Sequence, residues 1–404
     1  MSLTFADLGV PADLVSVLRR RDITTPTPIQ AASLADALGG ADVCGCAPTG
    51  SGKTIAFGLA MVARTLPAKP RRPHGLVLVP TRELAAQVAE ELTALAAARR
   101  LRVVAVYGGA GYERQRRALS RGADIVVATP GRLEDLLGAG HLTLADVAFA
   151  VVDEADRMAD MGFLPAVRRL LDAARRDRQT LLFSATLDGD VDVLVRRYQR
   201  NPRRHSVTRE DDGAKVEHFF WRAPRERRVE LTAGLIERHD RALVFCRTRH
   251  GADRLARQLG AAGIDTAAIH GSRTQGQRER ALAAFKSGSI QALVATDVAA
   301  RGIHVDGVPC VVHFDPAGDH KDYAHRSGRT GRAGAAGTVV TLVADEHMAA
   351  VRTLQRAAGL PEGVDQPDVA RKPAAARRAP VERTARRNQA KRSPRPQRRR
   401  RPRS

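Results

Sequence analysis

The stretch LVLVPTRELAAQVAEELTAL at residues 76–95 contains, in one unit, the pattern that sets the fold class of the whole chain. Residues 76–80 form a short apolar run with β-branched content, which is typical of a strand buried on both faces. Apolar residues then recur at helical spacing, with Leu84, Val88, Leu92 and Leu95 on one face. A buried strand followed directly by a helix is the repeating unit of a parallel sheet covered on both faces.

The same unit recurs in two series along the chain. The first series has expected strands at residues 76–80, 125–129, 148–152 and 180–183, and the second at residues 242–245, 266–269, 292–295, 310–314 and 339–343. Residues 201–215, between the series, contain Pro202, Gly213 and a mixed run of charges, so they predict a linker. After about residue 360, Pro, Ala and Arg dominate and apolar periodicity is lost, which predicts a disordered tail.

Composition limits the class of protein. A chain of 404 residues can form two domains, and 43% hydrophobic with 27% charged residues fits a globular protein. There is no apolar run of the roughly 18 to 20 residues that a membrane helix needs, and residues 1–10 lack the features of a signal peptide. We therefore expect a cytoplasmic protein without a membrane partner. The scattered Cys44, Cys46, Cys246 and Cys310 predict small buried thiols rather than metal sites or disulfides.

The charge of the chain is unevenly distributed. The formal net charge is +22, and residues 371–404 contain fifteen Lys or Arg and one acid, Glu382, which gives +14. The first 370 residues therefore carry about +8 (22 − 14). Both parts suit a polyanionic partner. The tail has no aromatic residue for base stacking, so it predicts either non-specific phosphate binding or a merely solubilising end.

A phosphate-binding loop is indicated by Ala-Pro-Thr-Gly-Ser-Gly-Lys-Thr at residues 47–54, after a short strand and before a helical run. Gly50 and Gly52 let the backbone turn so that its N–H groups point toward phosphate oxygens. Thr49, which precedes Gly50, and Ser51, which lies between the two glycines, are expected to contact the nucleotide as parts of the same loop. Lys53 can reach the β- and γ-phosphates, and the hydroxyl of Thr54 can bind Mg²⁺. The alternative is a Gly-rich turn without a ligand, which the Gly-Lys-Thr ending disfavours.

An acidic pair follows the expected strand at residues 148–152. Asp153 stands at the carboxyl end of that strand, where ligands bind in open α/β sheets. Its carboxylate can hold Mg²⁺, while Glu154 can position or deprotonate the attacking water. An acidic cluster after a strand is otherwise a helix N-cap, but the phosphate-binding loop favours the catalytic interpretation.

The motifs, taken in order, resemble those of the DEAD-box ATP-dependent RNA helicases of superfamily 2, most closely the bacterial RhlE-like type. In the first half these are the Q motif at residues 22–30 with the upstream aromatic Phe5, motif Ia at 80–84, the glycine doublet at 108–109, motif Ib at 129–132, motif II at 153–156 and motif III at 184–186. In the second half, motif IV lies at 244–248, the QxxR element at 275–278, motif V at 295–304 and motif VI at 325–332. As an ordered set these motifs are specific, although each could alone be a helix start.

The resemblance implies an α/β fold of two tandem RecA-like parallel-sheet domains with a disordered basic C-terminal tail. The implied division is a Q-motif segment (1–31), an N-terminal RecA-like ATP-binding domain (32–207), a linker (208–216), a C-terminal RecA-like helicase domain (217–360) and the Arg-rich tail (361–404). The implied cofactors are ATP and Mg²⁺. The implied activity is RNA-dependent ATP hydrolysis that separates short RNA duplexes or remodels RNA–protein complexes.

The resemblance also assigns roles to residues beyond the phosphate loop and the acidic pair. Gln30 is expected to read the adenine edge and Phe5 to stack on the base. The remaining expected nucleotide contacts are Gly302 and His304. The expected RNA contacts, all to the backbone and not to the bases, are Arg82, Gly109, Thr129, Arg132, Thr248, Gly271, Arg278 and Thr296. The residues expected to couple the two sites are Asp156, Ser184, Thr186, Arg301, His325 and Arg326.

Motif VI predicts a second source of catalytic charge. Arg329 and Arg332 are three residues apart, which places them on one face of an expected helix. Guanidinium groups that reach the γ-phosphate would act as arginine fingers, so hydrolysis would require closure of the two lobes. The alternative is a basic helix face in contact with solvent or nucleic acid.

Two positions depart from the family pattern. Asp22 replaces the usual Gly at the start of the Q motif, and His304 replaces the usual Asp at the end of motif V. A His can still hydrogen-bond a ribose hydroxyl, but it makes nucleotide affinity sensitive to pH.

Three functions remain open at this point: an RNA helicase, an ATP-gated RNA clamp with little unwinding, and a DNA helicase on the same core. The Q motif with the DEAD tetrapeptide favours RNA over DNA. We expect a monomer that binds RNA, with ribosomal or RNA-decay assemblies as possible partners.

Overall fold

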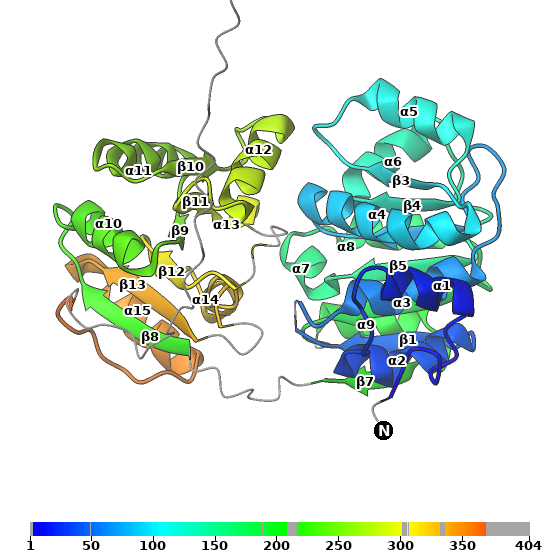
Figure 1. Ribbon diagram of the computed structural model, residues 1–404, viewed down its shortest axis with the longest axis horizontal. Helices are drawn as coiled ribbons and strands as arrows, with labels where there is room; N and C mark the ends of the chain where they lie inside the picture. The colour runs from blue at the N-terminus through cyan, green and yellow to red at the C-terminus, as the bar shows by residue number, and fades with distance from the viewer. Residues whose placement is uncertain are drawn as a thin grey trace, which may run out of the picture. The chain divides into compact units, whose positions relative to one another are not determined.

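The computed structural model describes residues 3–48, 50–187, 189–207, 216–300, 305, 307–331 and 336–368. These residues contain two parallel sheets, each covered by helices on both faces (Figure 1). The predicted fold class, two parallel-sheet α/β domains, is confirmed. The contact pattern assigns both sheets to one compact unit, Met1–Val369. The disordered tail was expected from residue 361, but Asp365 exchanges backbone hydrogen bonds of 2.8 Å with Phe220 and Arg222, so residues 361–368 do not fit that expectation. The rest of the expected tail, from residue 369 onward, lies outside the described residues.

The first sheet has seven parallel strands in the order β3-β4-β2-β5-β6-β1-β7. Their bounds are β1 Val43–Cys46, β2 Gly75–Leu78, β3 Val103–Val106, β4 Ile125–Ala128, β5 Phe149–Asp153, β6 Gln179–Ser184 and β7 Arg203–Ser206. Because the strands are parallel, the loops that follow the central strands β2, β5, β6 and β1 lie at one edge of the sheet. That edge is where ligands bind in open parallel sheets.

Side chains that alternate along these strands divide into two cores, one on each face. Val77, Val127 and Val151 pack into the first core with α1 Ala12–Arg19, α2 Pro28–Leu38, α3 Lys53–Arg64 and α4 Arg82–Ala96. Leu76, Val126 and Val152 pack into the second core, whose helices are α5 Tyr112–Arg121, α6 Pro130–Gly138, α7 Ala155–Asp160, α8 Leu164–Asp172 and α9 Asp190–Tyr198. A short 3-10 helix, η1 Ala97–Arg99, follows α4. Burial on both faces explains the near-continuous apolar runs in the sequence.

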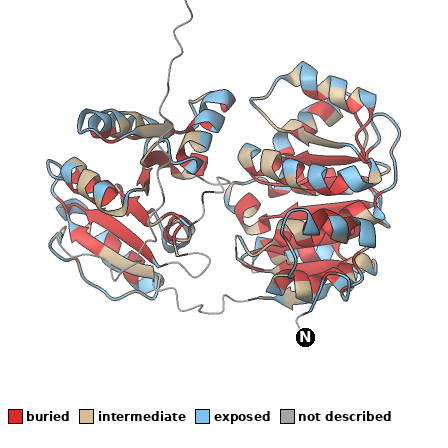
Figure 2. Ribbon diagram, in the orientation of Figure 1, coloured by how far each residue is buried: buried red, intermediate tan, exposed pale blue. Residues whose placement is uncertain are grey.

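The second sheet has six parallel strands in the order β10-β11-β9-β12-β13-β8. The strands are β8 Val216–Arg222, β9 Ala242–Cys246, β10 Thr266–Ile269, β11 Ala292–Thr296, β12 Cys310–His313 and β13 Gly337–Val343. The helices are α10 Arg228–His239, α11 Arg249–Ala261, α12 Gln275–Lys286, α13 Asp297–Ala300, α14 His320–Ser327, η2 Asp345–His347 and α15 Met348–Ala357. Figure 2 shows the central strands of this sheet, β9, β11, β12 and β13, buried, while its edge strands β8 and β10 are partly exposed.

Two local expectations were wrong. Residues 201–215 were expected to be linker, but Arg203–Ser206 form β7, which pairs with β1 at the edge of the first sheet. Its side chains are mostly exposed, so the strand lacks the apolar pattern that would have predicted it. The expected helix through motif VI ends at Ser327, because Gly328 closes it and Arg329 lies in the following turn.

Within the described part of the chain, no helix combines the length and the apolar character required to cross a membrane.

Candidate functional site

The phosphate-binding loop connects β1 to α3, as predicted. Gly50 and Gly52 have φ values of 83° and 91°, in the left-handed region that favours glycine. Lys53 is the first residue of α3, and its buried ammonium donates to the carbonyl oxygen of Ala47 at 2.8 Å. The ammonium is therefore held inside the loop, at the N-terminus of a helix, where anions bind.

The Q motif is attached directly to this loop. The Gln30 side-chain amide donates to the Gly52 carbonyl at 2.9 Å, while its oxygen accepts from the Thr27 N–H at 2.9 Å. The Thr27 hydroxyl donates to the Ser51 carbonyl at 2.8 Å. A Cβ on Gly52 would lie 2.5 Å from Gln30 Nε2, so only glycine permits this contact. The sequence did not predict that Thr27 and Gln30 support the phosphate loop.

Packing determines the position of the Phe5 side chain, and Asp22 stands where the backbone has a left-handed conformation. The Phe5 side chain is 2% exposed within the core of the first lobe, which leaves almost none of its ring surface accessible to a base. Asp22 has φ 58°, which explains why glycine usually opens the Q motif. Asp is among the residues that tolerate this region best.

The acidic pair lies at the end of β5, beside the phosphate loop. Asp153 and Glu154 are both buried, and Glu154 has the left-handed φ of 52° before α7 begins. Glu154 Oε2 accepts from Arg157 Nη1 at 3.0 Å. Burial on its own would raise the pKa of Glu154, but the positive charges of Arg157, Lys53 and Arg329 outweigh it, so the pKa lies below its ordinary value. Glu154 is therefore ionised at neutral pH.

Motif II is joined to motif III by two hydrogen bonds. The Asp156 N–H donates to Ser184 Oγ at 3.1 Å, and Asp156 Oδ2 accepts from the Ala185 N–H at 3.2 Å. Ser184 ends β6 and is fully buried, whereas Thr186 is exposed. Of the three expected coupling residues in this lobe, the structure therefore connects Asp156 and Ser184.

Motif Ia and the glycine doublet are in contact. The Arg82 guanidinium packs on Gly108 and Gly109, and a Cβ on Gly109 would overlap with Arg82 Nη1. Gly109 also has φ 81°, so glycine is required for two independent reasons.

Motif Ib begins α6. Thr129 is the N-cap residue, followed by Pro130 in the first turn. The Arg132 guanidinium lies 5.3 Å from the ring centroid of Tyr112, on α5. Arg132 Nε and Nη1 are buried and have no hydrogen-bond acceptor among the described residues. Arg132 Nε also lies 3.7 Å from Asp135 Oδ2, so the guanidinium is held between the Tyr112 ring and this carboxylate.

In the second lobe, the expected RNA contacts stand at the carboxyl ends of strands or at helix starts. Thr248 caps α11, and its hydroxyl oxygen accepts from the Gly251 N–H at 3.0 Å. Thr296 ends β11 and is buried, and Gly271 follows β10 beside the Arg249 side chain. Arg278 of α12 forms a buried ion pair of 2.7 Å with Glu83 of motif Ia, which was not among the expected residues.

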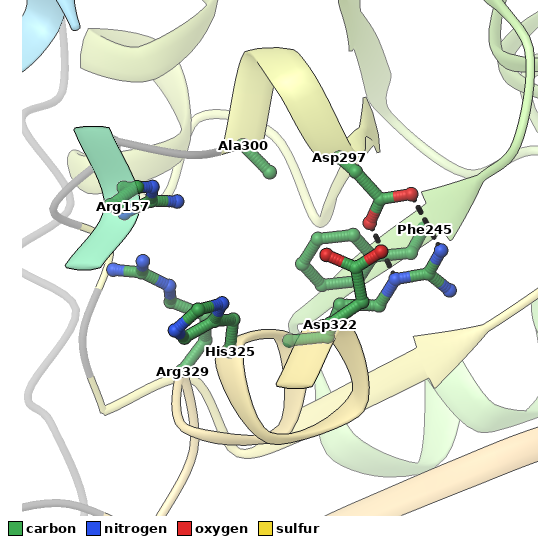
Figure 3. Close-up of a pocket in the computed structure, with 8 residues that line it drawn as sticks. Arg157, Phe245, Asp297, Ala300, Asp322, His325 and Arg329 are labelled. Carbon is green, nitrogen blue, oxygen red and sulfur yellow. Dashed lines mark hydrogen bonds and ion pairs between the residues drawn. The ribbon is translucent and has the colours of Figure 1, made fainter. Parts of the chain in front are cut away.

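Motif VI is held by motif V. Arg326 donates from Nε and Nη2 to the two oxygens of Asp297 at 2.5 and 2.7 Å, and its guanidinium lies over the Phe245 ring. Arg329 is 4% exposed, and together with His325 it lines a small pocket (Figure 3). The pKa of His325 is lowered, first by burial and then by Arg157, so the ring is neutral near pH 7.

The comparisons with known proteins agree with these motifs. A family model described as DEAD/DEAH box helicase matches residues 27–194, and one described as Helicase conserved C-terminal domain matches residues 226–334. The DEAD-box ATP-dependent RNA helicase CshA of Bacillus subtilis is 38% identical over 359 residues, which are 88% of this chain and 72% of that protein. The chain belongs to the DEAD-box helicase family.

Two plant relatives within the DEAD-box family are longer than this chain. The chloroplastic DEAD-box ATP-dependent RNA helicase 3A of Zea mays is 41% identical over 88% of this chain and 49% of that protein. The DEAD-box ATP-dependent RNA helicase 30 of Arabidopsis thaliana is 41% identical over 80% of this chain and 56% of that protein. The chain thus spans about half the length of these plant relatives.

Solved structures match most of the DEAD-box chain. A point variant of S. cerevisiae Dbp5 bound to RNA and ADP BeF3 is 25% identical with a TM-score of 0.79, and the match covers 91% of this chain and 96% of that one. A DEAD box protein from Methanococcus jannaschii is 32% identical with a TM-score of 0.52, covering 91% of this chain and 100% of that one.

Some predicted site residues of this DEAD-box chain lie outside the described residues: Thr49, Arg301, Gly302, His304 and Arg332. Sequence reasoning also missed residues that the structure places in the site. Thr27 lies within the Q motif, and Arg157 lies one helical turn after Glu154, so both could have been found from spacing. Glu83 could not, because its partner Arg278 is distant in the sequence.

Proposed function

We propose that the chain is an RNA-dependent ATPase that uses ATP binding and hydrolysis to separate short RNA duplexes or remodel RNA–protein complexes. The observation that carries this proposal is the ionised, buried Glu154 beside Lys53, on a helix start that is tied to motif III through Asp156. Family membership supports it. The named relatives are ATP-dependent RNA helicases, and the Dbp5 variant is bound to RNA and ADP BeF3.

The residues of the first lobe are suited to bind a nucleoside triphosphate. The phosphates would bind at the start of α3, with the Lys53 ammonium and the backbone N–H groups around Gly50 and Gly52 as donors. The Ser51 hydroxyl oxygen is buried without a hydrogen-bond partner among the described residues, which fits a ligand in this loop. Gln30 would read the adenine edge while it supports Gly52.

The same lobe fits a magnesium ion bound by few protein ligands. No cluster of three or more acidic, His or Cys side chains that could hold a metal exists among the described residues. Mg²⁺ instead accepts one or two protein oxygens and completes its shell with phosphate and water, so Thr54 and Asp153 would suffice. The ion would supply charge neutralisation to the phosphates. Glu154 would orient the attacking water and accept its proton, since the carboxylate is ionised at neutral pH.

The RNA site would consist of backbone contacts alone. Arg82 beside Gly109, together with Arg132 and Thr129, would bind phosphate and ribose from the first lobe, and Thr248, Gly271, Arg278 and Thr296 from the second. Arg329 and Arg332 would stabilise the charge of the transition state, with His325, Arg326, Arg301, Ser184, Thr186 and Asp156 as the coupling residues. Gly302 and His304 would complete the nucleotide site.

An ATPase assay with RNA, with matched DNA and without nucleic acid tests the proposal. We expect turnover to rise with RNA and not with DNA. Equal stimulation by DNA would overturn the RNA assignment in favour of a DNA helicase. RNA-stimulated turnover without strand release from a short duplex would instead identify an ATP-gated clamp.

We propose a monomer that acts in the cytoplasm on RNA bound independently of sequence, with ribosome or RNA-decay assemblies as partners. The proposed division of the chain is 1–31, 32–207, 208–216, 217–360 and 361–404. The RhlE-like subtype also remains a prediction.

A further inference from the structure

Helix α5 has a basic face that the proposed site does not use. Arg114, Arg117 and Arg121 follow one another at spacings of three and four residues, which places them on one side of the helix. All three are exposed, and none of their side chains forms a hydrogen bond or ion pair with another described residue. The only acid on the helix, Glu113, is neutralised by Arg116 at 2.7 Å.

A neighbouring loop brings two further exposed cations to the C-terminal half of α5. The Arg71 N–H donates to the Leu119 carbonyl of α5 at 3.1 Å, which attaches the loop to the C-terminal half of the helix. Lys69 and Arg71 are both exposed. We call Lys69, Arg71, Arg114, Arg117 and Arg121 the basic strip.

The acids around the basic strip do not cancel its charge. Asp146 is paired with Arg72 through two hydrogen bonds of 2.5 and 2.9 Å. Asp124 is 3% exposed and accepts from the N–H groups of Ala68 and Arg102. The strip therefore presents five positive side chains without an adjacent free carboxylate among the described residues, as a polyanion-binding surface requires.

The basic strip begins where the proposed RNA groove ends. Tyr112, in the first turn of α5, contacts the Arg132 guanidinium of motif Ib at 5.3 Å. The glycine doublet, against which Arg82 packs, lies just ahead of the same turn. Helix α5 thus starts beside the groove, and Arg114, the first of its free arginines, follows the glycine doublet by five residues, on the side of the helix opposite Tyr112.

We propose that the basic strip binds the sugar–phosphate backbone of an RNA strand where it continues beyond the groove of motifs Ia and Ib. This inference rests on the proposed function. A helix of ten residues is about 15 Å long, which corresponds to roughly four stacked nucleotides at about 3.4 Å each. RNA suits the strip better than an acidic protein, because Leu66 is the only large apolar side chain that the nearby loop exposes and protein interfaces need apolar anchors.

The test compares binding of a short and a long oligouridine, of about 6 and about 16 nucleotides, to the full chain at several salt concentrations. The variant is Arg114→Gln/Arg117→Gln/Arg121→Gln. The matched control is Arg19→Gln/Arg20→Gln/Arg176→Gln, which removes the same charge from exposed positions on other elements. RNA-stimulated ATPase with the short oligonucleotide is measured in parallel.

We expect the variant to bind the short RNA normally and the long RNA more weakly, with the control unchanged. Losing three phosphate contacts lowers the salt exponent by about 2, so the affinity loss between 50 and 200 mM salt shrinks by roughly 15- to 20-fold. Long-RNA binding equal to that of the control would overturn the inference, and so would an equal loss for both RNAs. Failure of the unaltered chain to bind either RNA would instead refute the proposed function itself, and the inference with it.

Discussion

At the scale of single residues, the pKa of Glu154 is set by two opposed effects, burial and neighbouring positive charge. Its carboxylate is buried, which opposes ionisation, yet the positive charges around it keep its pKa below the ordinary value. Arg157 forms the direct contact at 3.0 Å. A base that is ionised at neutral pH can accept a proton from water without first losing one of its own.

Glu154→Gln should reduce RNA-stimulated ATP hydrolysis by about 10²- to 10⁴-fold, because the amide cannot accept a proton. ATP and RNA should still bind, and RNA should be released slowly because the groups that bind both ligands remain. Single-turnover hydrolysis and RNA dissociation measure the two effects. Lys53→Ala is the contrast, since it should weaken ATP binding itself. Rapid RNA release by the Glu154 variant would count against the assigned role.

His313 is a buried titratable residue for which the proposed mechanism has no use. It ends β12, is 0% exposed, and both ring nitrogens have no hydrogen-bond partner among the described residues. The Tyr323 ring lies edge-on at 4.9 Å. Burial, aided by the charges of Arg326 and His218, holds the pKa of His313 well below 6.5.

The folded chain should lose stability below about pH 6.5, because there the unfolded chain binds a proton at His313 that the folded chain excludes. Stability from this group is complete above that pH and falls by about 1.4 kcal/mol for each pH unit below it. Urea unfolding at several pH values measures the slope. His313→Leu should flatten it, whereas His250→Leu, at an exposed position on α11, should not. An unchanged slope in His313→Leu would show that the ring is protonated in the folded chain.

At the scale of elements, the sequence predicted the strands that are buried on both faces. It did not predict the exposed edge strand or the end of the helix in motif VI. The strands with continuous apolar runs, β2, β4, β5 and β6, lie where they were expected, within one or two residues. Strand β7 was missed because an edge strand with exposed Arg203 and Arg204 has no burial pattern to reveal it. The end of α14 was also misjudged, because helical spacing alone cannot show that Gly328 stops the helix before Arg329.

In the candidate site too, features within one motif were predicted and contacts between distant segments were not. The position of a residue within a local motif, such as Lys53 at the start of a helix or Glu154 after a strand, was predicted from the sequence and agrees with the structure. Contacts between motifs were not, because they depend on which loops the sheet order brings together. The contact between Gln30 and Gly52 and the contact between Arg82 and Gly109 are both of this kind.

Gly109→Ala should weaken RNA binding while leaving ATP binding intact. The left-handed φ of 81° alone costs an alanine about 1 to 2 kcal/mol, and its Cβ would displace the Arg82 guanidinium. RNA and nucleotide affinities are measured separately, with thermal unfolding as a check on folding. Gly260→Ala on α11 is the control, because a Cβ there meets nothing within 4 Å. Normal RNA affinity in Gly109→Ala would mean that Arg82 is not a phosphate contact.

At the scale of the whole molecule, charge divides the chain more sharply than apolar pattern does. Residues 371–404 carry +14 of a net +22, which leaves about +8 for all the rest (22 − 14). Among the described residues, many arginines are paired with nearby carboxylates, as Arg21 is with Glu91 and Arg72 with Asp146, whereas the three arginines of the basic strip on α5 are in no such pair. Non-specific attraction to RNA should therefore come largely from the C-terminal segment, and positioning of the RNA from the lobes.

Deletion of residues 371–404 should separate these two contributions. Binding to RNA should become weaker and much less dependent on salt, because counterion release scales with the number of phosphates neutralised. The turnover number at saturating RNA and ATP should not change, since none of the proposed catalytic residues is removed. Binding titrations and ATPase rates at low and moderate salt measure both quantities. A deletion that kept the salt slope of the full chain would show that these residues are merely solubilising, while a lower turnover number at saturation would place them in the catalytic cycle.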